Sequence, residues 1–146
     1  MMTDSTPRMT VDAFIEKWQT TRAIERAVSQ SHFKDVCRLV GFPEPYDPGM
    51  SADDFAFEYT VKKIDGTTGF VDAFLRGHFG MEYKQRDKYK TLGQAYIQLN
   101  DYREGMNNPP LLLVCDIANW EIHTNFGGTS KKVYAFTHDD IRRPEI

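Results

Sequence analysis

The fold is decided by residues 69–84, which read Gly-Phe-Val-Asp-Ala-Phe-Leu-Arg-Gly-His-Phe-Gly-Met-Glu-Tyr-Lys. Two runs rich in aromatic and β-branched residues flank a turn-like sequence at 76–78, and this pattern predicts an antiparallel hairpin. In a hairpin centred on this turn, Asp72 lies directly opposite Glu82. Lys84 follows Glu82 by two residues and emerges on the same face of the sheet. Two carboxylates and an amine therefore converge on one patch.

Opposed carboxylates on one face of a hairpin are destabilising unless something neutralises their charge. A buried pair either shares a proton or binds a cation. Mg²⁺ suits this set because it takes oxygen ligands, keeps several waters and favours sites completed by substrate phosphate. An ammonium group beside such a site can orient a water or stabilise developing charge. The alternative is a surface hairpin in which Lys84 pairs with Glu82 and Asp72 is unrelated.

Asp72, nine further residues and then Glu82-Tyr83-Lys84 resemble the catalytic signature of the PD-(D/E)xK nuclease superfamily. Val71 stands where that superfamily usually has Pro. A longer series resembles the N-terminal nuclease domain of MmeI-type restriction–modification enzymes, in which one polypeptide carries endonuclease, adenine methyltransferase and target-recognition regions. The matching segments run in order between about Phe14 and Phe136, at residues 56–63, 69–72, 82–84, 98–102, 110–116 and 121–126.

This resemblance implies an α/β fold with a mixed sheet of about four or five strands flanked by helices. It implies a metal-dependent endonuclease that hydrolyses double-stranded DNA, with Asp72, Glu82 and Lys84 as catalytic residues. Asp72 and Glu82 would hold Mg²⁺, for which Mn²⁺ can substitute. S-adenosylmethionine would be used only in a downstream methyltransferase region, beside a downstream target-recognition region. The alternative is a non-catalytic DNA-binding or assembly module of a phage-defence DNA methyltransferase.

Residues 53–61 are expected to form a short helix that carries Glu58 ahead of the hairpin. In PD-(D/E)xK enzymes a glutamate on this helix often adds a metal ligand, and Glu58 matches that position by resemblance. The alternative is a solvated glutamate that pairs with Lys62 one helical turn later.

Further residues are candidates for contact with DNA. Gln98 and Tyr102 lie one turn apart on a helix expected from Thr91 to about Glu104. By resemblance, such a pair contacts the nucleic-acid backbone beside the active site, and the alternative is ordinary helix packing. Basic side chains can contact phosphates, or they can be solvated surface charges; the candidates are Lys62, Lys63, Arg86 and Lys88.

The composition limits the range of functions. The chain has 146 residues, a net charge of −3 and 40% hydrophobic residues, which is enough for one domain with a proper core. Such a charge does not favour strong nucleic-acid binding by this domain alone. Cys37 and Cys115 are expected to be buried free thiols. The sequence has no signal peptide and no transmembrane run, so we expect a cytoplasmic protein without membrane contact.

The remaining pattern predicts a nuclease-like domain at 10–136, after a polar tail at 1–9 and before the start of a linker at 137–146. Asp116 either lies near the metal patch or forms a turn. The four histidines are interpreted as structural or surface residues. Two more helices are expected, from Thr10 toward Ile24 and from Ser29 or Ser31 to Val40, with strands at 70–75, 79–84, 111–115, 120–124 and 132–136.

Overall fold

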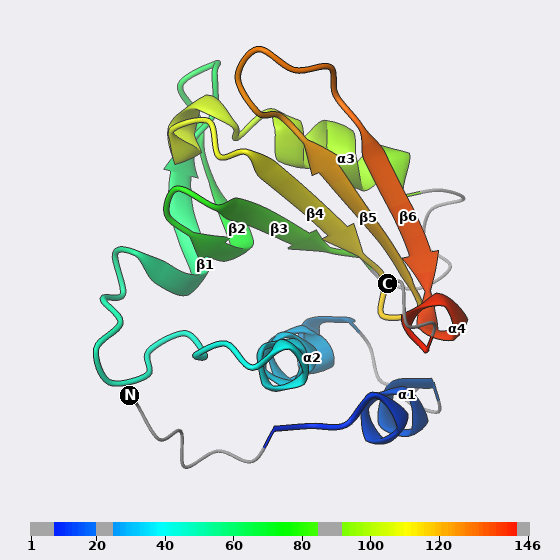
Figure 1. The fold of residues 1–146 in the computed structure, drawn as a ribbon. Helices are drawn as coiled ribbons and strands as arrows, with labels where there is room; N and C mark the ends of the chain where they lie inside the picture. The colour runs from blue at the N-terminus through cyan, green and yellow to red at the C-terminus, as the bar shows by residue number, and fades with distance from the viewer. Residues whose placement is uncertain (1–7, 20–24, 85–91, 143–146) are drawn as a thin grey trace.

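The computed structural model describes residues 8–19, 25–84 and 92–142, with the backbone alone for 25–27. The strands are β1 (Phe55–Lys62), β2 (Thr68–Leu75), β3 (Phe79–Tyr83), β4 (Leu111–Cys115), β5 (Asn119–Thr124) and β6 (Val133–Thr137). The helices are α1 (Val11–Gln19), α2 (Glu25–Val40), α3 (Gly93–Asn100), the short 3₁₀ helix η1 (Glu104–Met106) and α4 (His138–Ile141). The strands form one sheet in the order β1-β2-β3-β4-β5-β6 (Figure 1).

The sheet is mixed. Neighbouring strands are antiparallel except β3 and β4, which are parallel. Parallel neighbours need a crossover connection, and α3 lies in the segment that joins these two strands. Helices α1 and α2 cover one face of the sheet and α3 covers the other (Figure 1). The predicted α/β fold is therefore confirmed, and it is compatible with a restriction-endonuclease-like fold.

Each face of the sheet buries its own hydrophobic core. On the face covered by α1 and α2, the core includes Phe14, Trp18, Phe33, Tyr83 and Trp120. On the face covered by α3, the core includes Phe74, Leu99, Leu112 and Val114. Strands β2 and β4 contribute side chains to both cores. Burial on both faces explains why β4 is a continuous apolar run in the sequence.

The prediction of a helix at residues 53–61 was wrong, because Phe55–Lys62 form strand β1. From Phe57 to Lys62, more buried and exposed side chains alternate with a period of two, which is the strand pattern. The aromatic and β-branched side chains of this segment also favour a strand. The sheet has six strands, one more than the five segments predicted, because of β1. Glu58 therefore lies on a strand, where a one-turn helical pair with Lys62 cannot form.

The ends of the described chain also fold beyond the predicted boundaries. Helix α2 begins at Glu25, ahead of the expected serines. Residues 138–141, expected at the start of a linker, form α4 with a capping box at Thr137. The buried ring of His138 contacts Phe14, with ring centroids 6.2 Å apart. The folded region therefore reaches at least Ile141, while residues 1–7 of the expected tail lie outside the described part.

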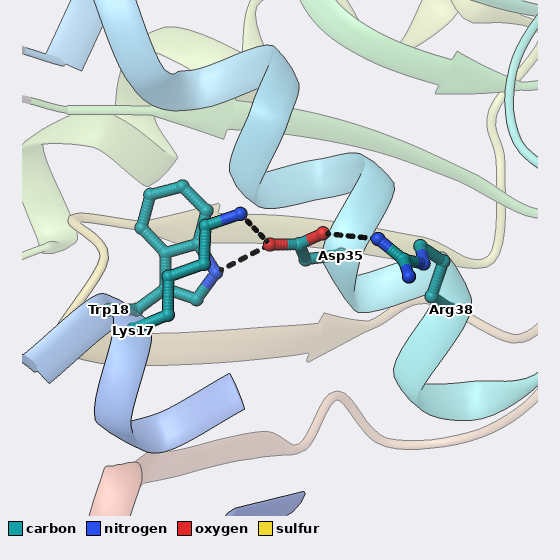
Figure 2. A network of polar contacts seen from close by, with 4 residues as sticks. All are labelled: Lys17, Trp18, Asp35 and Arg38. Atoms are coloured by element: carbon teal, nitrogen blue, oxygen red, sulfur yellow. Dashed lines mark hydrogen bonds and ion pairs between the residues drawn. The ribbon is translucent and has the colours of Figure 1, made fainter. Parts of the chain in front are cut away.

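A buried carboxylate, Asp35, joins the two helices of the α1–α2 face (Figure 2). Its Oδ2 accepts hydrogen bonds from Lys17 Nζ at 2.7 Å and from Trp18 Nε1 at 3.0 Å. Its Oδ1 lies 3.5 Å from Arg38 Nη1. Burying a charge is costly unless it is paired and hydrogen-bonded, and Asp35 meets that condition. We therefore assign it a structural role.

Cys37 and Cys115 are both buried and free, as predicted. Within the described part of the chain, no helix combines the length and the apolar character needed to cross a bilayer.

Candidate metal and phosphate site

The hairpin of β2 and β3 has the predicted register. Its ladder pairs Leu75 with Phe79 and Ala73 with Met81. One further step in the same register places Asp72 opposite Glu82, as a hairpin centred on residues 76–78 requires.

The strand pattern is interrupted at Asp72. The β1–β2 ladder includes Phe57 and Tyr59 but skips Glu58 and its cross-strand partner Asp72. Glu58 has a left-handed backbone, with φ 49°. Phe57 consequently packs in the core under α1 and α2, whereas Tyr59, two residues later, packs on the α3 face. The β2–β3 ladder stops at Ala73, so the backbone of Asp72 lies outside both ladders.

The side chains of the three predicted catalytic residues are held by short contacts. Asp72 Oδ2 accepts a hydrogen bond of 2.7 Å from the backbone N–H of Tyr83. Lys84 Nζ lies 3.3 Å from Glu82 Oε2 and donates a hydrogen bond of 2.5 Å to Gln98 Oε1 on α3. Glu82 Oε1 is buried and has no hydrogen bond of standard geometry to any described residue. The structure therefore brings Asp72, Glu82, Lys84 and Gln98 together on the α3 face.

The electrostatics of the carboxylate pair favour a retained proton. Burial, and to a smaller extent the adjacent charge of Asp72, raises the pKa of Glu82 to about 8. Burial also raises the pKa of Asp72, while the hydrogen bond from Tyr83 N–H opposes the rise. The positive charge of Lys84 lowers both pKa values but does not cancel the rise. A proton or a cation near this pair is therefore stabilising.

The two carboxylates fit the ligand requirement of Mg²⁺, which proteins commonly bind through one or two carboxylates together with waters and substrate phosphates. The buried Glu82 Oε1, which has no hydrogen bond of standard geometry to a described residue, is an oxygen of the required kind. No group of three or more His, Cys, Asp or Glu among the described residues is close enough together to hold an ion. Glu58 is exposed, and its charge raises the pKa of Asp72. Its role as a third ligand stays a prediction.

The predicted DNA-contact residues lie in different settings. Gln98 is exposed and joined to Lys84. Tyr102 is buried over Gly69, where its ring leaves no space for a Cβ. This setting agrees with the alternative in which Tyr102 packs in the core. Lys62 is exposed, and Lys63 Nζ lies 5.8 Å from the centre of the Tyr102 ring. The other two candidates lie outside the described residues: Arg86 and Lys88.

Asp116 forms a turn, which is the second of the two roles considered for it from the sequence. Its Oδ1 accepts hydrogen bonds from the backbone N–H groups of Ala118, at 3.1 Å, and Asn119, at 2.7 Å. These contacts form a turn between β4 and β5.

Sequence reasoning missed the contribution of Tyr83 to the site. It is the middle residue of the Glu-x-Lys signature, and its backbone N–H holds Asp72 while its hydroxyl lies 2.7 Å from His32 Nδ1. His32 is fully buried, which agrees with its interpretation as structural. His32 and Tyr83 lie 51 residues apart in the sequence, so no local pattern predicts this contact.

Comparison with known proteins agrees with the resemblance seen in the sequence. The chain matches a family described as MmeI, N-terminal domain, over residues 9–143. The match includes Asp72, Glu82 and Lys84 and every strand and helix of the described structure. No curated protein and no solved structure matches the chain.

Proposed function

Because the chain belongs to the family of MmeI N-terminal domains, and hence to a restriction–modification context, we propose that it is a metal-dependent DNA endonuclease domain. The observation that carries this proposal is the meeting of Asp72, Glu82 and Lys84 on the α3 face, where the buried Glu82 Oε1 has no hydrogen bond of standard geometry to a described residue. The reaction is hydrolysis of a phosphodiester bond in double-stranded DNA.

A bound Mg²⁺ supplies charge neutralisation at the phosphate and a more acidic water. Asp72 and Glu82 are the residues that would hold the ion, with Glu58 as a further candidate. Lys84 brings a positive charge to the same patch, where it stabilises negative charge on the scissile phosphate or orients the attacking water. Gln98 accepts a hydrogen bond from Lys84 Nζ and so fixes the direction of the amine.

Binding to DNA is expected to be weak for this domain alone, because its net charge is −3. The proposed phosphate contacts are Lys62, Lys63, Arg86 and Lys88. Tyr102 supports this region of the domain by packing in the core. We propose that downstream methyltransferase and target-recognition regions of the same enzyme read the sequence and use S-adenosylmethionine.

A second candidate function is a non-catalytic DNA-binding or assembly module of the same kind of enzyme. One observation favours it: the described residues contain no group of three metal-ligating side chains. The pair formed by Lys84 and Glu82 then serves only to neutralise a buried charge.

Thermal melting with Mn²⁺ separates these candidates, because an ion that binds only the folded state raises the melting temperature. At a tenfold excess over its dissociation constant, Mn²⁺ should add about 1.4 kcal/mol of stability. We expect Asp72→Ala and Glu82→Gln to lose this increment. The control Asp139→Asn, which changes an exposed carboxylate on α4, should keep it.

Plasmid nicking by the same variants in Mn²⁺ provides the activity readout, and it should follow the metal response. A wild-type protein that binds DNA but does not respond to millimolar Mn²⁺ would exclude the nuclease and support the binding module.

A further inference from the structure

Tyr83 connects the candidate site to the opposite face of the sheet. It lies between Glu82 and Lys84, whose side chains project toward α3. Because side chains alternate along a strand, the ring of Tyr83 projects to the face of α1 and α2, where it is 3% exposed. There its hydroxyl lies 2.7 Å from Nδ1 of His32 on α2. The backbone N–H of Tyr83 therefore contacts Asp72 at the candidate site, while its side chain packs on the opposite face of the sheet.

At its end, β3 is joined to β2 through a side chain in place of the backbone ladder. The ladder between the two strands stops at Ala73 and Met81, one step before Asp72 and Glu82. Beyond that point, the N–H of Tyr83 donates to the Asp72 side chain. On its other edge β3 remains paired to β4 as far as Tyr83. The separation of the two carboxylates therefore depends on where Tyr83 is held relative to β2.

His32 provides a rigid support for Tyr83. It is fully buried among aromatic rings, with centroids 4.9 Å from Trp18, 5.2 Å from Trp120 and 5.4 Å from Phe14. Its Nε2 has no hydrogen-bond partner among the described residues, so the contact with the Tyr83 hydroxyl is the polar contact that orients the imidazole.

The protonation state of His32 is compatible with this support. Burial, together with smaller contributions from the neighbouring His138 and Lys17, lowers the pKa of His32 to about 3. The imidazole is therefore neutral at physiological pH. A neutral ring can share one hydrogen bond with the hydroxyl at Nδ1 in either direction.

Given the metal site of the proposed function, we propose that His32 is a positioning residue: by holding the Tyr83 hydroxyl from the far face of the sheet, it sets the gap between Asp72 and Glu82 and so the affinity for the metal. The side chain itself touches neither carboxylate. It acts through Tyr83, as outer partners of metal ligands commonly do.

Three variants and a control test this role by calorimetric titration with Mn²⁺ at a temperature where all of them are folded. Tyr83→Phe removes only the hydroxyl and keeps the buried ring. His32→Leu removes the nitrogen, whereas His32→Asn keeps a hydrogen-bonding group near the position of Nδ1. Phe14→Leu is the matched control, because it loosens the packing around His32 and leaves the bond to Tyr83 intact.

We expect Tyr83→Phe and His32→Leu to weaken Mn²⁺ binding by about tenfold and His32→Asn to recover part of the loss. Phe14→Leu should lower the melting temperature and keep the wild-type affinity. If Tyr83→Phe binds Mn²⁺ as tightly as wild type, or if Phe14→Leu weakens binding equally, the positioning role is wrong and the proposed function stands. If wild type binds no Mn²⁺, both are wrong.

Discussion

At the residue scale, Glu82 has two oxygens in different settings. Oε2 lies 3.3 Å from the amine of Lys84, whereas Oε1 is buried with no hydrogen bond of standard geometry to a described residue. An ordinary structural carboxylate such as Asp35 has both oxygens paired. Glu82 is therefore paired with Lys84 through one oxygen only, and burial together with the charge of the neighbouring Asp72 raises its pKa.

The raised pKa of Glu82 predicts that metal affinity depends on pH. Its pKa in the folded protein is about 8, so a metal ion must displace a proton at neutral pH. We expect the Mn²⁺ dissociation constant to fall as pH rises from 6 toward 8, by up to about tenfold per pH unit, since one proton is displaced. Calorimetric titration at several pH values measures it. An affinity that stays constant over this range would contradict the assignment of Glu82 as a ligand.

At the element scale, the 3₁₀ helix η1 packs against β1 through a glycine. A Cβ on Gly105 would overlap the backbone carbonyl oxygen of Lys62, and backbone atoms cannot move aside as a flexible side chain can. We expect Gly105→Ala to cost about 1–3 kcal/mol in urea denaturation. The control Gly127→Ala has no neighbouring atom within 4 Å and should change stability little. Equal stability of the two variants would show that η1 does not pack this closely.

The contact between α1 and α2 has a separate test. In Asp35→Ala, the buried indole N–H of Trp18 loses its acceptor, which should cost about 1–3 kcal/mol in urea denaturation. Asp35→Asn keeps an oxygen acceptor and should cost less. A loss in Asp35→Asn as large as that in Asp35→Ala would contradict the role of the hydrogen bond to Trp18 in joining these helices.

The accuracy of the sequence predictions also differs between elements. The β2–β3 register was predictable because it depends on a short turn and on local alternation. Strand β1 was not, because Phe55, Ala56 and Tyr59 also lie at helical spacing. In addition, the left-handed backbone of Glu58 changes the face of the sheet on which the side chains of β1 pack. The contact between Tyr83 and His32 was also not predictable, because it exists only once α2 lies on the sheet.

At the scale of the whole molecule, two buried groups shift stability in opposite directions with pH. The folded pKa of His32 is lowered from 6.5 to about 3, so its contribution is present above pH 6.5 and is lost as pH falls toward 3. The folded pKa of Glu82 is raised from 4.5 to about 8, so its contribution is present below pH 4.5 and is lost as pH rises toward 8.

Together these groups predict that the metal-free protein is most stable between about pH 4.5 and 6.5. Melting temperatures measured from pH 3 to 9 with a chelator should fall on both sides of this range. Glu82→Gln should flatten the alkaline side and His32→Leu the acid side. A wild-type curve that keeps rising to pH 9, with no difference in Glu82→Gln, would contradict the assigned burial of Glu82.

Binding of a divalent ion between Asp72 and Glu82 can be located by the paramagnetic broadening that Mn²⁺ causes in nearby backbone amide signals. At low Mn²⁺ concentration, the amides of Asp72, Tyr83 and Lys84 should broaden first, while that of Asp35 on the opposite face stays sharp. The same signals should stay sharp in Asp72→Ala. Broadening that begins elsewhere on the surface, or that persists in Asp72→Ala, would contradict the account.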